Sequence, residues 1–217
     1  NEIYRRDVGG ICVVKGLDTF RNYFADYEEQ YVLIGGAACD IIFESNDATF
    51  RATRDLDMVL IVEALTPEFG ERFWKFIQNG RYRNKTTSVQ KPQFYRFDKP
   101  EDDTYPKMIE LFCRNNFELR KMTGITPIHI DDSVSSLSAI LLDDEYYKAL
   151  LEGKVVRNGL SVLRPEYLIL FKAKAYLDLK QMKEKGEAVD SSDIKKHKKD
   201  ILRITAELML ESVSELP

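Results

Sequence analysis

The strongest constraint in this sequence is a pair of aspartates at the entrance of an apolar strand. Asp55 and Asp57 flank Leu56 and lead into the run MVLIV, which is β-branched and apolar enough to be buried. Because side chains alternate along a strand, the two carboxylates point to the same face and Leu56 to the other. Neighbouring carboxylates repel each other unless a cation lies between them. The pair therefore indicates a site for a divalent metal ion.

An Asp-x-Asp pattern is short, and it also has a purely structural explanation. One carboxylate can face water at the start of the strand while the other pairs with an arginine such as Arg51 or Arg54. The pattern alone does not separate this alternative from a metal site. The metal site is favoured because matching residues occur both upstream and downstream in the chain.

A third carboxylate and a glycine turn complete the predicted site. Glu110 lies within an apolar segment, so three carboxylates converge if its strand lies beside the aspartate strand. Carboxylate oxygens are hard ligands that suit Mg²⁺ or Mn²⁺, and pairs of such ions are usual in phosphoryl transfer. Gly35 and Gly36 separate a short apolar strand from a helix, where backbone N–H groups can bind a phosphate.

Hydrophobic periodicity predicts an α+β fold, a mixed sheet with flanking helices followed by a helical part. We expect the division at Arg164-Pro165, with an α/β domain over 1–164 and a helical subdomain over 165–217. Helices are expected at 17–30, 37–44, 67–78 and 165–185, and from Ser191 or Ser192 as N-cap onward. Strands are expected at 31–34, 56–62, 94–97 and 107–113, with a strand pair within 125–142.

Composition excludes two classes of protein. The best apolar stretch, around 34–43, is broken by two glycines and an aspartate and is shorter than the ~20 residues that cross a bilayer, so we expect a soluble protein with no membrane contact. The formal net charge of −4 excludes the strongly cationic field of a non-specific DNA binder. The three cysteines are odd in number and far apart, which favours a cytoplasmic protein without disulfides.

Taken together, these motifs resemble the signature of the nucleotidyltransferase superfamily related to DNA polymerase β. The run Arg51-x-Thr53-x-Asp55-x-Asp57 is similar to the first motif of the AbiEii-type (abortive-infection, toxin–antitoxin) nucleotidyltransferases. Lys172 and the segment Asp193-x-x-Lys196-x-x-x-Asp200 resemble looser versions of later motifs in that family. The resemblance covers about residues 31–200.

The resemblance implies transfer of a nucleoside monophosphate from an NTP to a hydroxyl of RNA, such as tRNA, or of a protein. Asp55, Asp57 and Glu110 would bind the Mg²⁺ or Mn²⁺ ions, and Glu110 would also help to deprotonate the acceptor. Gly35 and Gly36 would hold the triphosphate, although the family often has serine in place of Gly36. A toxin of this type implies a cognate antitoxin. The resemblance assigns nucleotide binding also to Arg51, Thr53, Lys172, Lys196 and Asp200.

The residues of the later motifs can also have a structural role in place of nucleotide binding. Lys172 lies within the apolar arc of its expected helix, so either its stem follows that arc to water or its ammonium group points at the triphosphate. Asp193, Lys196, His197 and Asp200 share one helix face, an arrangement that also suits a solvated, self-paired surface.

Two other functions fit the same residues. A small-molecule nucleotidyltransferase of the aminoglycoside-modifying kind would share the fold and the metals but act on a different acceptor. A nucleotide-binding or partner-binding module would keep the fold without turnover. The presence of all three carboxylates weighs against the second of these.

Overall fold

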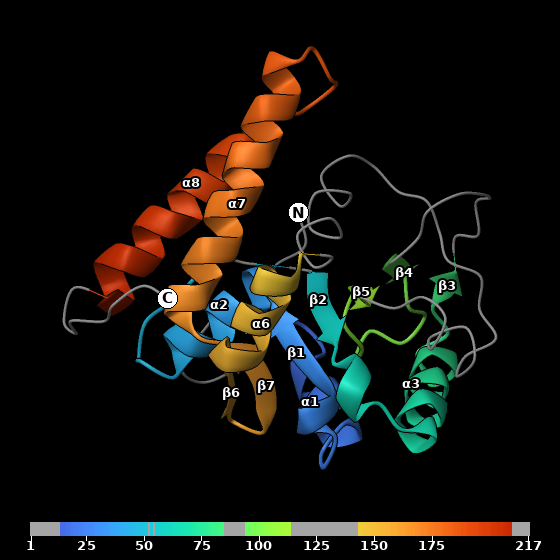
Figure 1. Ribbon diagram of the computed structural model, residues 1–217. Coiled ribbons are helices and arrows are strands. Elements are labelled where there is room, and N and C mark those ends of the chain that lie inside the picture. Colours follow the sequence, from blue (N-terminus) through green and yellow to red (C-terminus); the bar gives the residue numbers. More distant parts are fainter. Residues whose placement is uncertain (1–13, 52, 54, 85–93, 114–142, 210–217) are drawn as a thin grey trace.

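The chain folds into a mixed β-sheet with flanking helices, the α+β architecture that the sequence predicts. The computed structural model describes residues 14–51, 53, 55–84, 94–113 and 143–209. In this part of the chain, the seven strands have the order β3-β4-β5-β2-β1-β7-β6 (Figure 1). The strands are β1 (Tyr31–Ile34), β2 (Asp55–Leu60), β3 (Arg83–Asn84), β4 (Phe94–Asp98), β5 (Met108–Cys113), β6 (Lys154–Arg157) and β7 (Leu160–Leu163). The α-helices are α1 (Leu17–Tyr23), α2 (Gly35–Glu44), α3 (Pro67–Asn79), α6 (Asp144–Gly153), α7 (Pro165–Glu184) and α8 (Ser191–Ile204).

The two strands that carry the predicted carboxylates are direct neighbours. β2 pairs with β5 in parallel, and on its other side it pairs with β1 in antiparallel orientation. β4 lies antiparallel to β5, and β7 lies parallel to β1. The middle of the sheet therefore brings the strand before the diglycine and both carboxylate strands together.

An aromatic core fills one face of the sheet. Phe20 of α1 and Phe24, which directly follows α1, pack against Tyr31 of β1, and Phe73 of α3 packs edge-on against Phe97 of β4. Because neighbouring residues of a strand face opposite ways, Leu56, Met58 and Ile109 lie on this same apolar face. Asp57 and Glu110 consequently point to the opposite face, away from this core.

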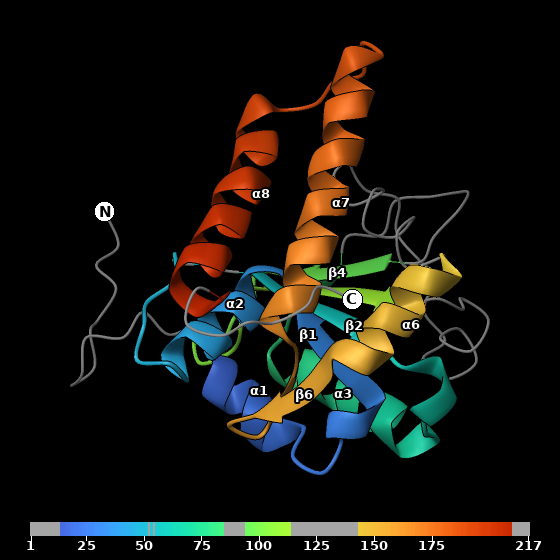
Figure 2. The ribbon, with the colours of Figure 1, turned by 60° about the vertical axis from the view of Figure 1, so that its left-hand side comes forward.

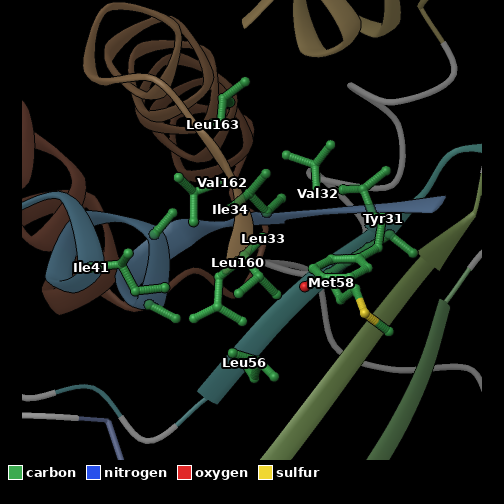
Figure 3. Close-up of a cluster of buried hydrophobic side chains, with 14 of the residues drawn as sticks. Tyr31, Val32, Leu33, Ile34, Ile41, Leu56, Met58, Leu160, Val162 and Leu163 are labelled. Carbon is green, nitrogen blue, oxygen red and sulfur yellow. The ribbon is translucent and has the colours of Figure 1, made fainter. Parts of the chain in front are cut away.

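The opposite face is covered by α2, α6 and the first turns of α7 (Figure 2). Side chains such as Val32, Ile34 and Leu163 gather there around β1 (Figure 3). α7 then runs away from the sheet, and α8 returns beside it toward α2 (Figures 1 and 2). No helix in the described ranges is both long enough and apolar enough to span a bilayer.

Several helix boundaries differ from the prediction, for local reasons. The helix expected over 17–30 ends at Tyr23, because Asp26 adopts a left-handed conformation with φ of 72° and only a 3-10 turn, η1 (Glu28–Gln30), follows. α2 starts at Gly35, two residues earlier than predicted. α8 is capped by Asp190, whose side chain accepts a hydrogen bond from the backbone N–H of Ser192, so neither predicted serine is the cap.

The stretch before α7 contains elements that the sequence did not predict. α6 and the β6–β7 hairpin follow the strand pair predicted within 125–142, which itself lies outside the described residues. α7 begins at Pro165, the predicted start of the helical part. Leu168 and Phe171 of α7 nevertheless belong to the same buried cluster as the strands. The division into two domains therefore stays a prediction.

Candidate functional site

The site is built on a row of residues that crosses four strands. Asp57 of β2 stands opposite Glu110 of β5 in the parallel register, and Ile34, the last residue of β1, stands opposite Asp57 on the other side. Arg96 of β4 stands opposite Glu110. The row thus runs from the end of β1 through two carboxylates to an arginine, and all of these side chains share the face that carries no aromatic core.

Asp57 lies in a strongly negative environment. It is half-buried, its carboxyl lies beside Glu110, with which it shares a hydrogen bond, and Asp55 adds a further negative charge. Burial, the Glu110 charge and this hydrogen bond raise the pKa of Asp57 well above its ordinary value, and Lys196 opposes them only in part. The neutral form of Asp57 is therefore favoured relative to an exposed aspartate.

Asp55 lies one strand period away from this pair. It stands opposite Met108, whereas Asp57 stands opposite Glu110. Within the described residues, no three His, Cys, Asp or Glu side chains are arranged to hold a metal ion as they stand. The predicted convergence of three carboxylates is therefore limited to two adjacent groups with the third nearby, because residues i and i+2 of a strand are about 7 Å apart.

Gly35 lets the chain turn directly above Asp57. The residue has φ of 67°, and a Cβ atom at this position would lie 1.9 Å from Oδ2 of Asp57. Only glycine tolerates both the conformation and the contact. α2 starts here, and no described side chain caps it, so its first N–H groups and positive dipole end lie next to the carboxylate pair.

Gly35→Ala is expected to reduce the nucleotide transfer that the sequence predicts on the order of a hundredfold, because the added methyl group displaces Asp57. Gly186→Ala is the matched control, since Gly186 also has a positive φ, of 85°, but has nothing within 4 Å of the added Cβ. Both variants carry the backbone strain, and only the first meets the carboxylate. Thermal melting and a transfer assay on both proteins check this, and equal activity in the two variants would contradict it.

The second glycine lies against the loop that precedes β2. A Cβ at Gly36 would lie 2.7 Å from Oγ1 of Thr53 and 3.5 Å from Nη2 of Arg51. Thr53 and Arg51 therefore border the start of α2, as the sequence pattern requires if they contact the same phosphate group. The guanidinium of Arg51 also lies over the ring of Phe50, which restricts its orientation.

Asp200 joins this loop to both C-terminal helices. Its Oδ1 accepts from Nε of Arg51 at 2.9 Å, and its Oδ2 accepts from Nη2 of Arg51 at 3.0 Å and from Nζ of Lys172 at 2.7 Å. Burial raises the pKa of Asp200, but the hydrogen bonds and charges of Arg51 and Lys172 outweigh it and lower the pKa. Lys172 and Asp200 are both buried. The Lys172 ammonium is therefore held inside the protein and its stem does not follow the helix to water, whereas its contact with a triphosphate stays a prediction.

The predicted residues of α8 differ in how far their side chains are exposed to solvent. Lys196 is exposed, and its charge acts on Asp57. His197 is half-buried, and burial together with Lys172 and Lys196 lowers its pKa to about 4, so the ring is neutral at pH 7. Asp200 is buried one turn further on. The face shared by these residues is thus not a uniformly solvated surface.

Arg96 is the site residue that the sequence analysis missed. Its Nε and Nη2 donate to Oε1 of Glu110 at 2.8 and 2.5 Å. The available signal was alternation: in Phe-Tyr-Arg-Phe-Asp, Arg96 must face away from Phe97, which is a core residue. The cross-strand partner could not be read from this pattern, because it depends on the register with β5.

Comparison with known structures shows a distant likeness. A solved structure described as an antigenic nucleotidyltransferase-like protein from Paracoccidioides brasiliensis is similar to this chain, with a TM-score of 0.44 and 16% sequence identity over 93% of this chain and 79% of that chain. No family model matches the sequence. No curated protein matches it significantly.

Proposed function

We propose that this chain is a metal-dependent nucleotidyltransferase of the superfamily related to DNA polymerase β. The observation that carries the proposal is the placement of Asp57 beside Glu110 at the N-terminus of α2, with Gly35 in contact with Asp57. Carboxylates bind the metal and a helix N-terminus binds the phosphate in this type of chemistry. Few structural roles need both features at one point of a sheet.

The donor set suits Mg²⁺ or Mn²⁺. Asp57 and Glu110 offer adjacent hard oxygen ligands, and Asp55, on the same face of β2 but one strand period away, would have to approach them to supply a third. The bound ion would neutralise the charge that accumulates on the phosphates during transfer. Burial and the neighbouring charges of Glu110 and Asp55 raise the pKa of Asp57, and this supports the assignment because a bound cation would relieve the repulsion between these carboxylates.

The other residues have roles in binding and proton transfer. The backbone N–H groups at Gly35 and Gly36 would bind the triphosphate, with Arg51 and Thr53 beside them. The acceptor hydroxyl would lose its proton to Glu110 as its oxygen bonds to the α-phosphorus and pyrophosphate leaves. Lys196 would face the departing phosphates, because its charge already acts on Asp57.

Lys172 and Asp200 fit an indirect role in this scheme. Asp200, which Lys172 holds by an ion pair, binds the guanidinium of Arg51 through Nε and Nη2 and so fixes it beside Gly36. Direct contact of Lys172 or Asp200 with the nucleotide, as the family resemblance implies, stays a prediction.

The surface of α8 supports RNA as the acceptor. Lys195, Lys196, Lys198 and Lys199 are exposed and form no ion pair with another described residue. On the same two helices Lys174, Lys180 and Arg203 each pair with an acid four residues away. Four unpaired lysines in a chain of net charge −4 form a local basic surface beside the site, which suits a phosphate backbone more than a small antibiotic. By resemblance the enzyme would be of the AbiEii-like toxin type, with a cognate antitoxin.

An acceptor screen tests this assignment. Purified tRNA and total RNA are compared with hydroxylated aminoglycosides and with protein acceptors, using labelled NTP and Mg²⁺. Lys195→Ala/Lys198→Ala/Lys199→Ala is expected to weaken RNA binding about tenfold or more and to reduce the slope of log affinity against log salt by about 3. Lys75→Ala/Lys99→Ala/Lys148→Ala removes three exposed lysines elsewhere and is the control. Transfer to an aminoglycoside but not to RNA would favour the small-molecule alternative.

A further inference from the structure

Arg96 contacts Glu110 in an unusual way for an arginine. An arginine beside a carboxylate often forms two parallel hydrogen bonds, one to each carboxylate oxygen. Arg51 binds Asp200 in this way, with Nε bonded to Oδ1 and Nη2 bonded to Oδ2. Arg96 instead directs both Nε and Nη2 to Oε1 of Glu110. The opposite strand positions of the two residues allow this contact without any distortion of the ladder.

Arg96 forms both of these hydrogen bonds to Oε1 of Glu110 and neither of them to Oε2. Oε1 is occupied by two short charge-assisted hydrogen bonds, and the Glu110 side chain is buried, so rotation about its last bond would break both. The carboxyl also faces Asp57 on the other side of the row. The strand order thus places Glu110 between a cation on β4 and a carboxyl on β2.

We propose that Arg96 is a positioning residue that holds Oε1 of Glu110 and leaves Oε2 for the reaction. The inference rests on the proposed function, and it assigns the proton of the acceptor to one oxygen atom. The acceptor O–H bond breaks and the proton passes to Oε2. The acceptor oxygen then bonds to the α-phosphorus, and the bond from this phosphorus to the oxygen of pyrophosphate breaks.

The same contact makes Arg96 a built-in counter-ion of the carboxylate pair. Its guanidinium neutralises part of the charge that Asp57 and Glu110 would otherwise present to each other. Removal of Arg96 should therefore make the pair depend more strongly on an added divalent cation. This consequence can be measured without any turnover.

Arg96→Met tests the positioning role by kinetics. We expect kcat to fall on the order of a hundredfold while KM for the NTP stays within about twofold, because in this scheme Arg96 acts through Glu110 and not on the nucleotide. Arg96→Lys should recover about tenfold of this loss, since it keeps the charge without the planar fork. In a Glu110→Gln background, Arg96→Met should cause no further loss. Arg157→Met, an exposed arginine on the far edge strand β6, is the control.

A thermal measurement keeps the inference independent of the proposed function. The rise in unfolding temperature on addition of Mg²⁺ should be at least twice as large in Arg96→Met as in the natural protein, with Arg96→Lys between them. An equal rise, or no rise in either protein, would overturn the inference, as would a higher KM or an additive loss with Glu110→Gln. If Arg96→Met does not fold, Arg96→Lys and Arg96→Gln decide by the same criteria. If the natural protein transfers no label to any acceptor, the proposed function fails and the thermal comparison alone decides the role of Arg96.

Discussion

Asp57→Asn is expected to abolish Mg²⁺-dependent transfer and, at the same time, to stabilise the metal-free protein. The first effect follows because the substitution removes the central metal ligand, which is worth about 4 kcal/mol, or roughly a thousandfold in rate. The second follows because an amide next to Glu110 ends the repulsion between two buried carboxylates. We expect the free energy of unfolding at pH 8 to rise by about 1–3 kcal/mol.

The pH dependence of stability gives this prediction a definite sign. The folded state raises the pKa of Asp57, so folding takes up protons, and the stability of the metal-free protein falls as the pH rises from about 4 through the folded pKa. Asp40 acts in the same direction, because burial and the nearby Glu44 raise its pKa to about 7. Asp40→Asn should remove the part of the decline that is centred near pH 7, and Asp57→Asn should remove the part that Asp57 contributes.

Urea unfolding of the metal-free protein between pH 4 and pH 9 measures both components. Asp18→Asn, an exposed aspartate on α1, is the control for a lost charge and should change neither activity nor the pH slope. A stable Asp57→Asn protein that still transfers label would contradict the assignment of Asp57. A destabilised one would contradict the electrostatics of the pair.

Asp200→Ala is expected to destabilise the protein by about 3–5 kcal/mol. The reason is that the substitution leaves two cations, Arg51 and the buried Lys172, without their shared carboxylate. Because Arg51 borders Gly36, transfer activity should also fall in any protein that remains folded. Asp200→Ala therefore tests whether α7 and α8 support the phosphate-binding loop.

A double mutant separates the energetic coupling of Asp200 with Lys172 from the loss of the Asp200 side chain alone. Lys172→Met removes one of the two cations with similar side-chain volume, so Asp200→Ala should cost clearly less in that background than in the natural protein. Asp178→Ala is the control, since Asp178 pairs with Lys174 on the same helix pair but away from the loop. Additive costs for Asp200→Ala and Lys172→Met, measured by urea unfolding, would show that the buried pair is not coupled.

The local part of the fold could be predicted from the sequence. β1, the Gly35-Gly36 turn, β2 and β5 each carry their own signal, because apolar β-branched runs and glycine bends are properties of short segments. The alternation rule also placed Asp57 on the face that Glu110 shares once the two strands pair. The β6–β7 hairpin and α6 were missed, because their short segments mix polar and apolar residues.

The contacts that assemble the site could not be predicted in the same way. Arg51 and Asp200 are 149 positions apart, and nothing in either segment specifies the other. The contact of Arg96 with Glu110 depends on a strand register, and a shift of one residue would have turned Arg96 into the core. The register also explains why Asp55 stands apart from the pair that Asp57 forms, which the sequence pattern alone had grouped with it.

The most direct test follows the two ends of the nucleotide. The purified protein is incubated with Mg²⁺ and RNA and with NTP that carries the label on either the α- or the γ-phosphate. If Asp57 and Glu110 form the centre of a nucleotidyltransferase, the α-label becomes attached to the acceptor, the γ-label leaves as pyrophosphate, and both events stop in Asp57→Asn. Transfer of the γ-label to the acceptor, or α-label transfer that persists in Asp57→Asn, would contradict this function.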